Sequence, residues 1–281
     1  MDDATYTTSW TATEAHANAR IDAFLAAQLP WRSRVSLVAM LRKGAARVNG
    51  HSVKKAHRLA LGDLVELELP AVDVPHEEIA AIELPVLFED DDLIVVNKPP
   101  GLPVHPASTC PYVNALARLQ LRYTQDFPDP SAEPSVIHRL DRGTSGVIAF
   151  ARRRGLVAYY AGQFERRTVG KRYTAIVEGQ PPDQAVIDTP LLVVDGQRVT
   201  AHPDGKPSHT EYRVIARTPT LALVQIVLRT GRKHQIRAHF TSEGFPLLYD
   251  DLYRRRAPDE VWPPDARPML HARQLQLTHR T

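Results

Sequence analysis

The sequence has little cysteine and no long hydrophobic run. Cys110 is the single cysteine, so an internal disulfide is excluded, and we interpret it as a packing residue rather than a nucleophile. No apolar stretch approaches the roughly 18 to 20 residues that cross a bilayer, and the start, MDDATYTTSW, lacks the pattern of a secretion signal. These absences argue against a disulfide framework and a membrane span, and they predict a cytoplasmic protein with no membrane partner.

Acidic residues are missing from one stretch near the N-terminus. Between Asp22 and Asp63 there is no aspartate or glutamate, although the net charge of the whole chain is only +3. The same window contains many cations: Arg32, Arg34, Arg42, Lys43, Arg47, Lys54, Lys55 and Arg58. Such a window predicts a phosphate-binding surface, with a solvated charged surface as the alternative.

The basic window lies within a recognisable series of short elements. Apolar residues at helical spacing predict a helix over 20–29, and a second helix is expected from Ser33 to Gly44. Asn49-Gly50 predicts a tight hairpin turn, and the alternation at 65–69 predicts a half-buried strand. Over 18–70 this order resembles the S4 RNA-binding domain.

The remainder of the chain predicts an α+β domain. Residues 71–85 are acidic and bounded by prolines, as in a linker. From Val86 onward, short strand-like runs alternate with helical segments without a regular βαβ repeat, which favours a mixed, largely antiparallel sheet. Two segments rich in proline and charge, 122–134 and 254–268, are expected to be loops that are flexible or touch the ligand.

One carboxylate lies within a polar turn between apolar runs. Residues 136–150 read VIHRLDRGTSGVIAF, and Asp141 lies between Arg139 and Arg142. If these cations lie near it in space, they favour the charged carboxylate that a nucleophile or base requires. A structural ion pair in a turn is the alternative.

A second motif combines a strand end with a basic helix. Residues 228–240 read LRTGRKHQIRAHF, which brings together Arg229, Arg232, Lys233 and Arg237. This pattern suits an RNA backbone, the Asp141 carboxylate, or both, while a solvated helix face remains the alternative. His234 and His239 are five positions apart, so we predict no metal site here.

Two further strands carry side chains that fit such a site. In KRYTAIVEG (171–179), Tyr173 is either a cross-strand packing residue or a platform for an extruded base. In DDLIVVNKPPGLPVHP (91–106), a strand enters a proline-rich turn that carries Lys98 and His105.

In this order the four segments resemble the RluA-type family of RNA pseudouridine synthases. The resemblance runs from about Leu87 to His279 and rests mainly on HRLDRGTSG and LRTGRKHQIRAH. It implies a mixed sheet with a central RNA cleft. We therefore expect an N-terminal extension (1–17), an S4-like RNA-binding domain (18–70), a linker (71–85) and a catalytic domain (86–281).

The resemblance also implies residue roles. Asp141 is expected to be the catalytic aspartate, Tyr173 the tyrosine beside the target base, and Arg237 the cation that pairs with the carboxylate. Arg139 is expected to enter the RNA stack where the uridine leaves it. Other expected RNA contacts are Lys98, Arg232, Lys233, Arg34, Arg42, Lys43, Arg47, Lys54 and Lys55. The sequence departs from the family in GFPLLYDDLY (244–253), where a histidine usually precedes the proline and a glycine usually occupies the place of Tyr249.

The implied reaction is an isomerisation that consumes nothing, so no cofactor or metal is expected. Whether the carboxylate attacks C1′ or removes a sugar proton is left open. We expect a monomer acting on large-subunit ribosomal RNA, with transfer RNA as the alternative substrate. A non-catalytic RNA-binding protein is the second hypothesis. A phosphotransferase, suggested by HRLD alone, lacks the expected glycine-rich loop and DFG.

Overall fold

A computed structural model describes residues 5–29, 32, 34–70, 76–106, 112–195, 198–254 and 256–281. The chain forms two compact units, one from residues 1–82 with 105–128 and the other from 83–104 with 129–281. Each unit is described by itself. Within the described residues, no helix is both long and apolar enough to span a membrane.

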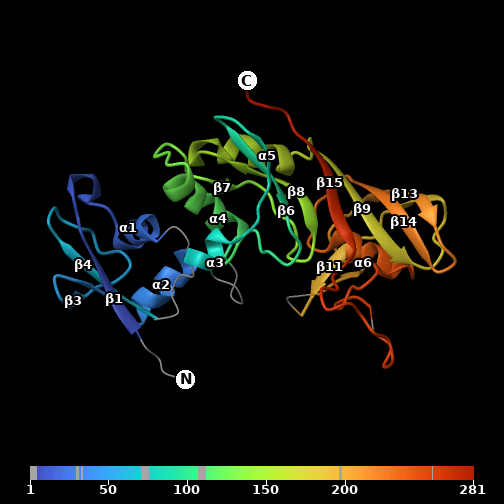
Figure 1. The fold of residues 1–281 in the computed structure, drawn as a ribbon, viewed down its shortest axis with the longest axis horizontal. Coiled ribbons are helices and arrows are strands. Elements are labelled where there is room, and N and C mark those ends of the chain that lie inside the picture. The colour runs from blue at the N-terminus through green and yellow to red at the C-terminus, as the bar shows by residue number, and fades with distance from the viewer. Residues whose placement is uncertain are drawn as a thin grey trace. The chain divides into compact units, whose positions relative to one another are not determined.

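The first unit is a small antiparallel sheet covered by two helices (Figure 1). Its strands lie in the order β1-β4-β2-β3, and its helices α1 and α2 pack apolar side chains such as Phe24, Leu25 and Leu37 against Leu67. The elements are β1 (Thr5–Thr11), α1 (Ile21–Gln28), α2 (Arg34–Arg42), β2 (Ala46–Val48), β3 (His51–Ser52) and β4 (Leu64–Pro70).

Most of these elements agree with the sequence pattern. The two helices and β4 lie where apolar spacing predicted them, and Asn49 and Gly50 take the positive φ values, 51° and 79°, that a tight hairpin turn requires. Strand β1 was not predicted, because TYTTSWT is mostly polar. It pairs with β4 along its whole length, more than 50 residues away in sequence. The S4 likeness and the domain boundaries stay predictions.

The linker and first proline-rich segment contain short helices. Residues 71–75 and Cys110 lie outside the described residues, but α3 (His76–Ala80) follows them and packs on α4 (Ala115–Leu121) through Ile79 and Leu121. Within the predicted loop 122–134, the segment Arg122–Asp126 forms a π-helical turn. Part of the region expected to be catalytic therefore belongs to the first compact unit.

The second unit is built on a nine-stranded mixed sheet (Figure 1). The order is β10-β13-β14-β9-β15-β8-β6-β5, with β7 paired to β8; in this described sheet only β15 and β8 run parallel. This confirms the predicted largely antiparallel α+β fold. The strands are β5 (Val86–Glu89), β6 (Leu93–Lys98), β7 (Ser135–Val136), β8 (Ser145–Ala151), β9 (Gly170–Glu178), β10 (Gln184–Ile187), β13 (Thr210–Arg217), β14 (Leu221–Leu228) and β15 (Leu270–Gln276).

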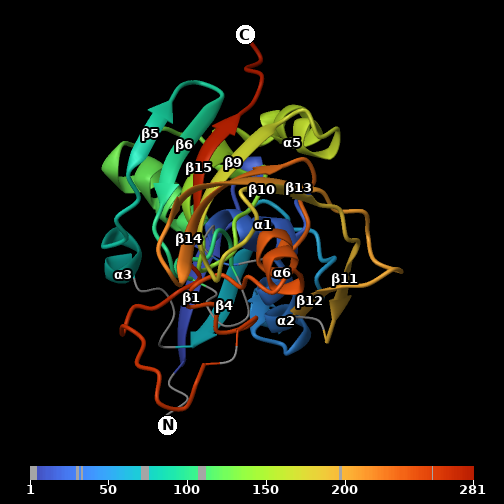
Figure 2. The same cartoon turned by 90° about the vertical axis from the view of Figure 1, so that its right-hand side faces the viewer.

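Two helices bury parts of this sheet. Helix α6 (Gln235–Ser242) packs Ile236 and Phe240 on Val177 of β9 and Val224 of β14, and Figure 2 shows it below β10 and β13. Helix α5 (Val157–Glu165) packs Tyr160 against the β6–β8 side. A separate hairpin, β11 (Leu191–Val194) and β12 (Arg198–Ala201), packs on the other side of α6 through Val199 and Ala238.

Gly146 permits the parallel pairing at the middle of the sheet. Its φ is +115°, and a Cβ atom there would lie 2.2 Å from the backbone oxygen of Ala272. No side chain fits this approach of β8 to β15, so HRLDRGTSG needs its last glycine for packing.

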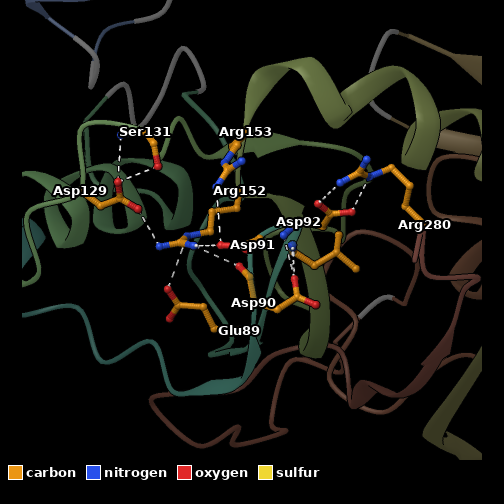
Figure 3. A network of polar contacts seen from close by, with 10 residues as sticks. Glu89, Asp90, Asp91, Asp92, Asp129, Ser131, Arg152, Arg153 and Arg280 are labelled. Atoms are coloured by element: carbon orange, nitrogen blue, oxygen red, sulfur yellow. Dashed lines mark hydrogen bonds and ion pairs between the residues drawn. The ribbon is translucent and has the colours of Figure 1, made fainter.

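A polar network fixes one end of β5, β6 and β8 (Figure 3). Arg152 binds Asp129 (2.7 Å) and Asp91 (3.2 Å), while Arg280 makes two 2.8 Å hydrogen bonds to the buried Asp92. Tyr160 donates a further hydrogen bond to Asp92. The segment after β15 is thereby attached to the turn between β5 and β6.

The second proline-rich segment, 254–268, is anchored by an aromatic ring. Residue 255 lies outside the described part. Arg254 and Arg256 approach the ring of Trp262, with Cζ 5.4 and 5.7 Å from its centre, and Tyr249 meets it edge-on. Arg254 also binds Glu178. Tyr249, which stands where the family usually has glycine, has a φ of +60°.

Candidate active site

A cavity of about 530 Å³ lies in the second unit, between the turn before β8 and the start of α6. Asp141, Tyr173 and Arg237 all line it, although they are distant in sequence. Tyr173 comes from β9 and Arg237 from α6. Alternation along β9 puts Tyr173 on the face that α6 covers, which explains how the two side chains reach one cavity.

The turn that carries Asp141 is held in place by residues 97–101 (NKPPG). The Lys98 ammonium donates to the backbone oxygens of Pro99 (2.8 Å), Leu102 (2.8 Å) and Arg142 (3.2 Å). Gly101 donates its backbone N–H to the same Arg142 oxygen. Lys98 is fully buried, so the prediction that it contacts RNA is wrong. Burial lowers the pKa of Lys98 to about 8, and the nearby Asp141 charge opposes this shift.

The arginines beside Asp141 in sequence do not neutralise it. Arg142 turns away and donates to the Gly101 oxygen at 2.9 Å, and Arg139 is exposed at the cavity. Among the described residues, His234 approaches Asp141 with its Nε2 atom 3.9 Å from the carboxylate, and burial lowers the pKa of this histidine. The expected charge stabilisation by Arg139 and Arg142 is therefore corrected: the cations near Asp141 come from other elements.

Arg237 pairs with Asp250 rather than with Asp141. Its guanidinium makes a two-pronged contact with Asp250, at 2.7 and 2.6 Å, and both residues are buried. The direct pair with Asp141 predicted from the sequence is thus wrong. Burial acts to lower the pKa of Arg237, but the hydrogen bonds and the charge of Asp250 raise it, and the charge of Asp141 adds to this through space. Arg237 remains a permanent positive charge in the wall of the cavity.

Comparison with known proteins identifies the family to which this chain belongs. The family model described as RNA pseudouridylate synthase matches residues 92–242, which include the Asp141 turn, Tyr173 and Arg237. This chain belongs to the RNA pseudouridine synthase family. It is therefore an isomerase that acts on RNA, and the resemblance drawn from HRLDRGTSG is confirmed.

Curated relatives match nearly the whole synthase. Ribosomal large subunit pseudouridine synthase C of Vibrio vulnificus is 34% identical over 94% of this chain and 86% of the relative. Uncharacterized RNA pseudouridine synthase YlyB of Bacillus subtilis is 35% identical, covering 88% and 82%. Among solved structures, human RNA Pseudouridylate Synthase Domain Containing 4 superposes with a TM-score of 0.57 at 28% identity, over 68% of this chain and 83% of that one.

Tyr173 and Lys171 present adjacent polar groups to the synthase cavity. Burial, with the Asp141 charge, raises the pKa of Tyr173, so the hydroxyl stays protonated at neutral pH. Lys171 donates to the Thr230 oxygen at 2.9 Å, and burial lowers its pKa to about 8. The Tyr173 ring is half-buried, as a platform for a base would be.

Apart from the buried Lys98, the predicted RNA-binding side chains fall into two groups. Arg139, Arg232 and Lys233 line the cavity, and Arg232 also donates to the Pro207 oxygen. The other group belongs to the first unit and is exposed: Arg34, Arg42, Lys43, Arg47, Lys54 and Lys55. Of these, Arg34 pairs with the buried Asp22 at 3.1 Å.

Sequence reasoning missed three side chains of this site. His234 was considered only as a metal ligand, and Asp250 and Lys171 were not considered. Asp250 directly follows Tyr249, whose φ is positive. Residue spacing does not predict the direction of the chain after such a residue, so the sequence did not place Asp250 beside Arg237. One sequence feature could have identified His234 as a residue of the site. It lies between Lys233 and Gln235, at the start of the predicted helix that contains Arg237.

Proposed function

We propose that this synthase isomerises uridine in large-subunit ribosomal RNA, with Asp141 as its catalytic carboxylate. The observation that supports the residue assignment is the shared cavity, in which Asp141 meets Tyr173 and Arg237. The substrate assignment is supported by the names of the relatives, several of which are ribosomal large subunit pseudouridine synthases at 34% identity over 94% of this chain.

Each side chain has a defined task in this proposal. The carboxylate of Asp141 acts on the sugar, by attack on C1′ or by removal of a sugar proton, and the N-glycosidic bond breaks. Tyr173 supports the freed uracil while it turns and rejoins C1′ through C5, after which the C5 proton is lost. Arg237 adds positive charge to the cavity wall where negative charge develops on uracil.

Extrusion of the uridine costs a few kcal/mol, which RNA contacts elsewhere must offset. Arg139 is exposed at the cavity, so it can occupy the space that the base leaves in the stack. The exposed cations of the first unit supply phosphate contacts to a neighbouring RNA helix, because A-form grooves hide most base information.

The substrate is tested by tritium release from RNA labelled with [5-³H]uridine, prepared from cells that lack this gene. We expect release from large-subunit ribosomal RNA with the wild-type chain and none with Asp141→Ala. Transfer RNA is the comparison substrate. Release from transfer RNA alone would overturn the ribosomal assignment while leaving the enzyme assignment intact.

The role of the basic surface is tested by salt dependence. Replacing Lys54 and Lys55 together by glutamine should flatten the plot of log binding constant against log salt by roughly 0.7 to 0.9 for each phosphate that the variant no longer neutralises. The rate of the bound complex should not change. The matched control is the exposed pair Arg153 and Arg154 of the second unit, also replaced by glutamine. Equal slopes for both variants would count against the proposed surface.

A further inference from the structure

His234 caps the N-terminus of α6 and has an unfavourable backbone conformation. Its φ is +52°, in the left-handed region that side chains other than glycine rarely adopt. Its side chain is only 13% exposed and lies in the wall of the cavity. Such a backbone conformation persists only where the surrounding structure holds it, and it is common at functional sites.

The hydrogen bonds of Tyr253 determine which nitrogen of His234 carries the proton. The backbone N–H of Val199 donates to the Tyr253 oxygen at 2.9 Å, and His234 Nδ1 lies 3.0 Å from the same oxygen. The tyrosine has one hydrogen to donate, and Nδ1 is the acceptor within reach. With a proton on Nδ1, that nitrogen and Val199 would both donate to the Tyr253 oxygen, and the buried Tyr253 O–H would have no acceptor, which costs about 1 to 3 kcal/mol. Nδ1 therefore accepts, and the proton lies on Nε2.

The protonated nitrogen faces the proposed catalytic carboxylate. Nε2 of His234 is 3.9 Å from Oδ1 of Asp141. This is longer than a hydrogen bond, but a movement of about 1 Å brings the two groups into range. Hydrogen bonds in active sites often shorten in this way when substrate binds.

The surroundings keep the His234 ring neutral. Burial lowers the pKa of His234, and the charges of Arg237 and Lys233 act in the same direction. Asp141 and Asp250 oppose them. Tyr253, the remaining titratable neighbour, keeps its proton because burial raises its pKa. A neutral ring has one N–H group, here on Nε2, which lies 3.9 Å from Asp141 Oδ1.

We propose that His234 is a positioning residue whose Nε2–H group donates a hydrogen bond to Asp141 and aims that carboxylate at the sugar, with Tyr253 fixing the tautomer. The inference rests on the proposed catalytic role of Asp141. His234 exchanges no proton in this role. It orients one carboxylate oxygen and leaves the other free to react.

The tautomer is measured directly by ¹⁵N correlation spectroscopy on the full chain labelled at its histidines. We expect a protonated Nε2 and an unprotonated Nδ1 for His234 near neutral pH. His234→Gln identifies the signals among the twelve histidines. In Tyr253→Phe the two tautomers should mix, because the donor to Nδ1 is gone. A protonated Nδ1 in the wild type would overturn the proposal.

Single-turnover kinetics test whether this geometry matters. His234→Ala should lower the rate of the saturated complex by about 100-fold, the cost of a displaced reacting group, without weakening RNA binding. His234→Gln retains an N–H donor and should recover part of the rate. His202→Gln, an exposed histidine outside the cavity, is the control. A wild-type rate for His234→Ala would refute the inference alone, whereas an active Asp141→Asn would refute the carboxylate assignment on which it rests.

Discussion

Asp141→Asn should lower pseudouridine formation on the order of 10³-fold or more while leaving the fold intact. Asparagine has nearly the shape of aspartate but cannot act as a charged nucleophile or base. The Asp141 turn is held through backbone groups by Lys98 and Gly101, so it does not depend on the carboxylate. Tritium release under single-turnover conditions measures the loss.

Two controls make this result decisive. Mass spectrometry must show that asparagine has not deamidated to aspartate, and hydrogen exchange of the backbone amides must match the wild type. Asp259→Asn alters an exposed aspartate outside the cavity and should keep full activity. Turnover of Asp141→Asn within tenfold of the wild type would show that another group performs the chemistry.

Asp250→Ala should destabilise the region around α6 by about 3 to 5 kcal/mol. The change leaves the buried guanidinium of Arg237 without its two-pronged partner, and an unpaired buried charge is costly. Because the chain has two compact units, one global unfolding midpoint is not a sound measure. Hydrogen exchange of the α6 backbone amides reports the local opening free energy instead.

A double variant separates stability from catalysis. Arg237→Met with Asp250→Leu removes both buried charges and should restore much of the exchange protection, since apolar replacements of an ion pair are often tolerated. Activity should remain low, because the positive charge in the cavity wall is gone. If Asp250→Ala changed the opening free energy by less than about 1 kcal/mol, the pair would not have the structural role given to it here.

The sequence was most informative where neighbouring residues determine the structure. Helical spacing located α1 and α2, and Asn49-Gly50 located the β2–β3 turn, because each depends on a few adjacent side chains. Strand β1 escaped detection because its partner β4 is distant and its own pattern is weak. Local periodicity does not contain such pairings.

In the candidate site, too, the sequence motifs indicated which residues belong together but not which side chains contact one another. Asp141, Tyr173 and Arg237 do line one cavity, as the resemblance implied. Arg139 and Arg142 were expected to stabilise Asp141 because they adjoin it in sequence, whereas the pair of Arg237 with Asp141 was implied by the resemblance; the structure shows other partners for Arg142 and Arg237. Lys98 is a buried support for the turn, and Asp250, from a turn after α6, takes the place predicted for Asp141 beside Arg237.

The parallel pairing of β8 with β15 has a consequence for the order of folding. Strand β15 is the last of the described strands in sequence, yet it lies in the middle of the sheet and joins the β8 side to the β9 side. Until Leu270–Gln276 is available, the two halves of the sheet have no common strand and each presents an open edge. Closing the sheet joins residues 145 and 271 across a long loop, a step that is slow for entropic reasons. During synthesis, the cavity that brings Asp141 to Tyr173 can therefore form only after Leu270–Gln276 has been made and has entered the centre of the sheet.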